Sequence, residues 1–212
     1  MVMLEKILIT GTGRAGTSFL MVLLTLLGLD TGFKINDPKT FSLPNAAGME
    51  RKIIANHKIL KNPIFMEDIE DIVQMPDIGL KYVIIPIREY EASAKSRFEN
   101  SEKHIWEGSL WGANTVESQE AFYHKIMANY LKVMVQYDIP TIFIDFKRMI
   151  ADITYLYNKL TPILPTDTIH LDRFKKAYEE ATIIAKRKVF YTHFNITSDP
   201  EKPEKQFRTM FK

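Results

Sequence analysis

The chain has 212 residues, of which 46% are hydrophobic, and this is enough to bury a full core. We expect one α/β domain over residues 1–195, followed by a charged tail over residues 196–212. A net charge of +2 is too small to predict nucleic acid or a membrane as the main partner. The chain has no cysteine, which excludes disulfides, thiolate nucleophiles and cysteine-ligated metals. The apolar run at residues 19–29 is too short to span a bilayer, and no basic-then-apolar leader precedes the first strand, so we expect a cytoplasmic protein.

An apolar run followed by a glycine-rich turn opens the chain. Residues 4–10 predict a buried parallel strand, and the turn GTGRAGTS follows it before a helix begins. Gly11, Gly13 and Gly16 allow backbone conformations that a Cβ forbids, and they let the amides approach a ligand closely. The first N–H groups of the helix and its positive dipole end add to this attraction. The turn therefore predicts a site for phosphate or sulfate.

Two known kinds of phosphate-binding loop fit this turn only in part. A dinucleotide fingerprint would use the three glycines, but it requires a second strand that ends in an acidic residue about 20 residues further on. Residues 28–40 contain no such strand. A Walker A loop requires a lysine where Thr17 stands, so the phosphate-binding lysine of a kinase is missing.

The turn resembles the 5′-phosphosulfate loop of the P-loop sulfotransferase family, in its bacterial type. Arg14 stands at the family's basic position, and Thr17 and Ser18 stand as hydroxyl donors. The resemblance implies a three-layer α/β P-loop fold, with a mostly parallel sheet of four or five strands flanked by helices. It also implies transfer of a sulfuryl group from 3′-phosphoadenosine 5′-phosphosulfate (PAPS) to a hydroxyl or amine, without a metal. Arg14 would offset charge on the leaving phosphate oxygen.

The next predicted elements are two helices separated by a loop. Residues 19–27 are apolar nearly all round, and Gly28 is expected to end this helix in the position that glycine favours. Residues 30–47 are polar and contain prolines, which makes them a candidate binding loop. Residues 65–75 predict a helix with a solvated acidic face.

Residues 48–63 hold three candidate catalytic side chains. Lys61, before Asn-Pro, resembles a Lys-x-Pro element of the family, and Glu50 loosely resembles its Gly-x-x-Glu element. The resemblance implies Glu50 or His57 as the general base and Lys61 as the group that offsets charge on the leaving oxygen. Taken alone, Glu50 is also explained as an exposed helix carboxylate, and His57 as an isolated histidine without a catalytic role.

A second motif lies at the end of another predicted strand. Residues 82–87 predict a buried strand that ends at Arg88, and Ser96 lies on the helix that follows. In the sulfotransferase family, the 3′-phosphate site resembles this pair, with an arginine at a strand end and a serine at the same spacing. A guanidinium can hold a phosphate with two hydrogen bonds, and the serine hydroxyl can donate a third.

The rest of the chain predicts alternating helices and a strand. Residues 101–115 contain two tryptophans, which could stack on an adenine or an acceptor or could pack the loop down. A long amphipathic helix covers residues 122–137, and residues 141–146 form an apolar strand. The last predicted helix covers residues 172–188.

The sequence thus predicts a sulfotransferase that uses PAPS and releases adenosine 3′,5′-bisphosphate. Its acceptor is an unidentified small molecule, glycan or peptide, and we expect no nucleic-acid partner. The residues expected to bind the donor are Gly11, Gly13, Arg14, Ala15, Gly16, Thr17, Ser18, Arg88 and Ser96.

Two alternatives stay open from the sequence. A nucleotide-dependent kinase could use Asp145, at the end of a predicted strand, to hold magnesium. A degenerate P-loop protein could bind a nucleotide without catalysis or serve as an interaction module.

Overall fold

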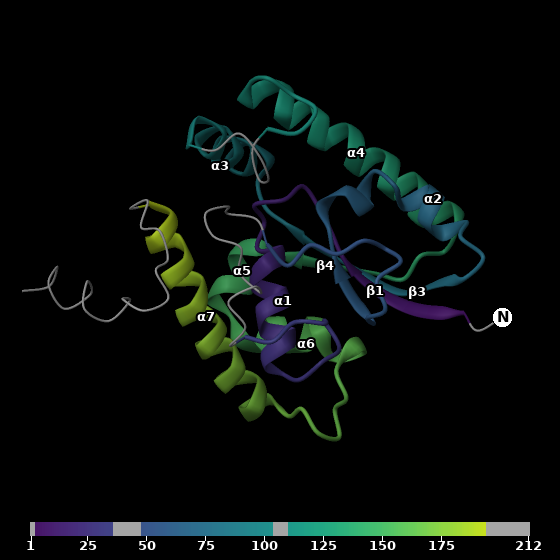
Figure 1. Ribbon diagram of the computed structural model, residues 1–212, viewed down its shortest axis with the longest axis vertical. Helices are drawn as coiled ribbons and strands as arrows, with labels where there is room; N and C mark the ends of the chain where they lie inside the picture. The colour runs from purple at the N-terminus through teal and green to yellow at the C-terminus, as the bar shows by residue number, and fades with distance from the viewer. Residues whose placement is uncertain (1–2, 36–47, 104–109, 194–212) are drawn as a thin grey trace, which may run out of the picture.

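The computed structural model describes residues 3–35, 48–103 and 110–193 (Figure 1). Within these ranges the sheet has four strands, all parallel, in the order β2-β1-β3-β4. The strands are β1 (Leu4–Ile9), β2 (Ile59–Lys61), β3 (Ile78–Ile87) and β4 (Thr141–Asp145). The first strand is therefore central, as its continuous apolar sequence predicts.

Helices cover both faces of this sheet (Figure 1). One layer holds α1 (Thr17–Leu26), α5 (Phe146–Ala151), α6 (Ile153–Leu160) and α7 (Leu171–His193). The opposite layer holds α2 (Ile69–Val73), α3 (Tyr90–Lys103) and α4 (Val116–Gln136). Short 3₁₀ turns are η2 (Pro63–Met66) and η3 (Thr161–Ile163). These layers confirm the predicted three-layer α/β fold.

The side chains of β1 separate the two cores because successive residues of a strand point to opposite faces. Ile7 and Ile9 pack into the core under α1, α6 and α7. Leu8 packs into the core under α2 and α4. All three are at most 2% exposed, so the central strand is covered on both sides.

The order of the strands creates a crevice at their carboxyl ends. The chain passes from β1 through α1 to β2 on one side, and then crosses to β3 on the other side of β1. The loops after β1 and β3 consequently lead to helices on opposite faces of the sheet. In open parallel sheets, ligands bind where two neighbouring loops diverge in this way.

Several element boundaries differ from the predicted ones. The strand predicted over residues 82–87 begins at Ile78, and the final helix continues to His193. The helix predicted over residues 65–75 divides into η2 and α2. The side chain of Asn62 accepts a hydrogen bond from the Ile64 amide at 3.2 Å, and this cap starts η2 as a separate turn.

Gly28 ends α1 as predicted. Its φ of 83° is left-handed, and its amide donates to the Thr25 carbonyl at 3.0 Å. The Leu29 amide donates to the Leu24 carbonyl at 3.0 Å, which completes a Schellman motif.

Three expectations fall wholly or partly outside the described residues. They concern most of the loop over residues 30–47, part of the tryptophan segment over residues 101–115, and the tail over residues 196–212. No helix of the described ranges has the length and apolar composition that a membrane span requires.

Candidate functional site

The connection from β1 to α1, residues 10–16, is called the glycine loop below. It has positive φ angles at Gly11 (133°), Gly13 (73°), Arg14 (55°) and Gly16 (88°). Gly16 is the N-cap of α1, and no side chain caps this end of the helix. The loop therefore turns the chain sharply and leaves the first amides of α1 without a side-chain acceptor.

Two of these glycines also have side chains packed against them, which would have to shift to admit a Cβ. A Cβ at Gly13 would lie 2.3 Å from Nη2 of Arg97. A Cβ at Gly16 would lie 2.3 Å from Cε of Met149, on α5. The loop is thus packed closely on one side by α3 and on the other by α5.

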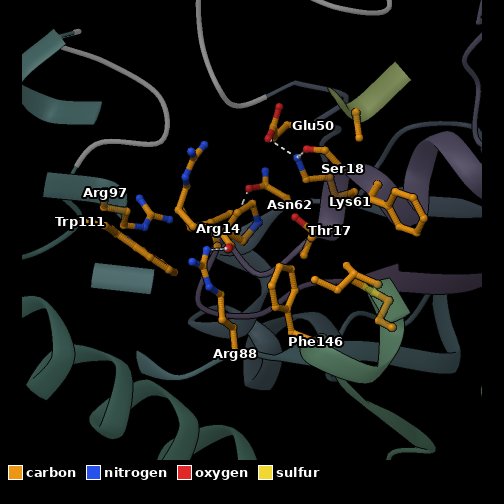
Figure 2. Close-up of a pocket in the computed structure, with 18 residues that line it drawn as sticks. Arg14, Thr17, Ser18, Glu50, Lys61, Asn62, Arg88, Arg97, Trp111 and Phe146 are labelled. Atoms are coloured by element: carbon orange, nitrogen blue, oxygen red, sulfur yellow. Dashed lines mark hydrogen bonds and ion pairs between the residues drawn. The ribbon is translucent and has the colours of Figure 1, made fainter. Parts of the chain in front are cut away.

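Three arginines meet at the glycine loop (Figure 2). Nη1 of Arg88, just after β3, donates to the carbonyl oxygen of Arg14 at 2.8 Å. Nε of Arg14 donates to Oγ of Ser96, on α3, at 3.0 Å. Nε of Arg97 donates to the carbonyl oxygen of Thr12 at 3.3 Å. The structure therefore brings the predicted pair, Arg88 and Ser96, to the predicted loop.

The positive charges of this cluster oppose one another. Burial lowers the pKa of Arg14, and the neighbouring charges of Arg97 and Arg88 lower it further. Burial also lowers the pKa of Arg97, which is 5% exposed and stacks on the Trp111 ring at 5.3 Å. The Arg88 guanidinium lies over the Phe146 ring at 5.0 Å. An anion between these guanidinium groups would relieve the repulsion.

A buried lysine forms a second charged centre beside the loop. Lys61, the last residue of β2, is 2% exposed. Its Nζ donates to Oγ of Ser18 at 3.0 Å, to the carbonyl oxygen of Gly48 at 2.7 Å and to Oε1 of Glu50 at 2.5 Å. Lys61 thus links the start of α1 to the segment around Glu50.

The carboxylate of Glu50 is held ionised by this contact. Burial raises the pKa of Glu50, but the charge and hydrogen bond of Lys61 outweigh it, so the pKa lies below its ordinary value. Met49, immediately before it, is buried with a left-handed φ of 68°. Backbone strain of this kind is maintained only where the surrounding contacts determine the conformation.

These groups surround one cavity of about 550 Å³, called the central cavity below. Figure 2 shows its 18 lining residues, with Arg14, Arg88 and Arg97 on one side and Ser18, Lys61 and Glu50 on the other. Of the predicted site residues, those that line it are Gly13, Arg14, Gly16, Thr17, Ser18, Glu50, Lys61 and Arg88.

No family model, curated protein or solved structure matches this chain.

Four predicted residues do not line the central cavity. Gly11 and Ala15 belong to the glycine loop but do not line the cavity. Ser96 contacts the cavity-lining residue Arg14 and does not line the cavity itself. His57 lies before β2, and its Nδ1 is 2.9 Å from Oδ1 of Asp30. The cavity lies at the carboxyl end of β2, so the structure does not bring His57 to the groups it was expected to serve.

The residue suggested for a kinase also lies apart from the loop. Asp145 ends β4, which pairs with β3 and not with β1. Its carboxylate accepts the Arg148 amide at 2.7 Å and caps α5.

The sequence did not identify Arg97 and Phe146 as members of the site. Arg97 directly follows Ser96, and Phe146 directly follows β4, so both adjoin positions that the sequence had marked. What places them at the cavity is the packing of α3 and α5 against the glycine loop.

Replacement of Glu50 by alanine is expected to destabilise the fold by roughly 2 to 3 kcal/mol, because the buried Lys61 side chain then loses its ion pair with Glu50. Urea unfolding at pH 7 measures this loss. The double variant Glu50→Ala/Lys61→Met removes the charge as well and is expected to recover most of the loss. As a control, Glu91→Ala breaks an exposed pair with Lys95 and should have little effect. An equal loss in both single variants would contradict the assignment.

The same ion pair predicts a pH dependence with a definite sign. The pKa of Glu50 is lowered in the folded protein, so its contribution is complete above the ordinary value of 4.5. That contribution disappears as pH falls through the lower folded pKa. The stability difference between wild type and Glu50→Gln, followed by urea unfolding from pH 7 to pH 3, should therefore shrink at the acidic end. A difference that grows on acidification would refute the pairing.

Proposed function

We propose that this protein transfers a sulfuryl group from PAPS to an acceptor hydroxyl. The observation that carries the proposal is the meeting of the glycine loop with Arg88 and Ser96, from segments 74 and 82 residues away in sequence. PAPS has an anionic group at each end of its ribose, a 5′-phosphosulfate and a 3′-phosphate. Two neighbouring anion sites in one cavity suit such a molecule better than a single polyphosphate chain.

The residues that line the central cavity, together with Ser96 behind Arg14, can be assigned to the two anionic groups. The amides at the start of α1, with the hydroxyls of Thr17 and Ser18, would hold the 5′-phosphosulfate. Arg88 and Ser96 would hold the 3′-phosphate by charge-assisted hydrogen bonds. Trp111 and Phe146 line the same cavity and offer faces on which an adenine can stack.

Arg14, Glu50 and Lys61 then have separate roles in the transfer. The donor supplies a sulfuryl group whose S–O bond to the 5′-phosphate breaks, and the bonding pair stays on the phosphate oxygen. Arg14 and the start of α1 offset that growing negative charge. The acceptor oxygen forms the new S–O bond, and Glu50 takes its proton. Lys61 keeps Glu50 ionised and beside Ser18, close to the phosphosulfate.

The alternatives have less support. A nucleotide kinase would need a lysine at Thr17, which this chain lacks, and its candidate magnesium ligand, Asp145, caps α5. A protein that only binds nucleotides does not account for an ionised carboxylate that lines the cavity close to the start of α1.

Calorimetry with adenosine 3′,5′-bisphosphate in the presence of a metal chelator tests the proposal. We expect the wild type to bind it without metal and in preference to magnesium-ATP. Arg88→Ala should weaken binding roughly 10- to 100-fold, since one charge-assisted phosphate contact is lost. Ser96→Ala should have a smaller effect in the same direction.

The matched control is Arg148→Ala. Arg148 is exposed on α5, stacks on Tyr155 at 3.8 Å and does not line the central cavity. Its variant should bind the bisphosphate like the wild type. Preference for magnesium-ATP, or equal affinities of the Arg88 and Arg148 variants, would overturn the proposed function.

A further inference from the structure

The wall of the central cavity changes character beyond Ser18 and Lys61. All the charged lining residues belong to the glycine loop, to α3 or to the segments around Glu50, Lys61 and Arg88. Apart from Thr17, Ser18 and Asn62, the wall on the side of α1, η2, α5 and α7 is apolar. Its residues are Phe19, Pro63, Ile64, Met149, Ile150 and Ala185.

This apolar wall begins directly beside the reactive groups. Phe19 follows Ser18, whose hydroxyl accepts from Lys61, and Ile64 lies three residues after Lys61 in the turn η2. In Figure 2 the labelled residues Ser18, Lys61 and Glu50 lie together, on the side away from Arg97 and Trp111. A compound that contacts the apolar wall can therefore place one polar end at Glu50.

Two isoleucines of this wall are open to solvent. Ile64 is 45% exposed and Ile150 is 54% exposed, although both line the cavity. They come from different elements, η2 and α5, and converge on the same space. When an apolar ligand covers apolar side chains at the rim of a concave site, their removal from water favours binding.

The same wall offers little to a strongly polar ligand. Its side chains carry no strong hydrogen-bond donor or acceptor, and the side-chain oxygen of the nearby Asn62 already caps η2. A glycan or a charged peptide would lose water from its polar groups on this wall without regaining hydrogen bonds, which is costly for each group.

Building on the proposed sulfuryl transfer, we propose that the acceptor is a hydroxyl compound with an uncharged apolar body, such as a hydrophobic alcohol or phenol. Its body lies on Phe19, Ile64, Met149 and Ile150, and its hydroxyl reaches Glu50. The hydroxyl proton passes to Glu50 as the acceptor oxygen forms its bond to sulfur. The S–O bond to the 5′-phosphate breaks, and the pair remains on the phosphate.

The test compares acceptors at a fixed concentration of PAPS, with release of adenosine 3′,5′-bisphosphate and sulfated product both measured. The hydrophobic probes are 1-naphthol and 1-octanol, and the polar probes are glucose and N,N′-diacetylchitobiose. We expect transfer to at least one hydrophobic probe and an apparent specificity, kcat/KM, at least tenfold higher for it than for either sugar.

Variants locate the acceptor on the apolar wall. Ile150→Asp and, separately, Ile64→Asp place a carboxylate there and should raise the KM for the hydrophobic probe roughly tenfold or more. Affinity for adenosine 3′,5′-bisphosphate should change far less. The matched control is Ile183→Asp, because Ile183 is 52% exposed on α7 and does not line the cavity. Both isoleucines are surface-accessible, and thermal unfolding checks that each variant folds.

The possible failures are distinguishable. If the wild type binds the bisphosphate but prefers a sugar, transfers to no hydrophobic probe, or shows equal KM values in the Ile150 and Ile183 variants, the acceptor proposal is overturned and the donor assignment stands. If the wild type does not bind the bisphosphate at all, the proposed function is overturned, and the acceptor proposal with it.

Discussion

The close packing of the Arg97 guanidinium against the glycine loop is the constraint on which the site depends. Arg97 occupies the space that a Cβ at Gly13 would need, and it bonds to the Thr12 carbonyl. Arg88 bonds to the next turn of the same loop, at the Arg14 carbonyl. The loop backbone is thus held at two carbonyl groups by Arg88 and Arg97. The glycine loop and the arginine cluster are one structural unit.

The sheet topology explains why Lys61 and a cavity lie beside the glycine loop and its arginines. β1 lies between β2 and β3, so the carboxyl ends of all three strands meet at one edge. The glycine loop, Lys61 and Arg88 follow from these three ends. The loops then separate toward opposite faces of the sheet, and the space between them becomes the cavity. The three arginines lie on the α3 side and the Lys61–Glu50 pair lies on the other, whereas α1, η2, α5 and α7 supply apolar side chains.

Local patterns in the sequence predicted the fold class, and they marked several of the residues that the structure brings together at the glycine loop. Glycines at a strand-to-helix turn, and an arginine at the end of a buried strand, both mark the carboxyl ends of strands. In a parallel sheet these ends meet at one edge, so the residues are expected to lie close together. The Lys61–Glu50 pair was not predicted as a pair, because it depends on the strained backbone at Met49. His57 was misplaced because β2 is short, and only the structure shows at which end of it each residue lies. The place of Arg97 in the site could not be predicted, because it depends on how α3 packs against the glycine loop.

A crystal structure of the protein with adenosine 3′,5′-bisphosphate and no metal tests the proposed sulfuryl transfer most sharply. We expect the 5′-phosphate at the amides of Thr17 and Ser18. We expect the 3′-phosphate within hydrogen-bond distance of the Arg88 guanidinium and the Ser96 hydroxyl, with the Arg14–Ser96 bond rearranged to admit it. A bisphosphate bound away from Arg88, or with neither phosphate at the glycine loop, would overturn the assignment of the site.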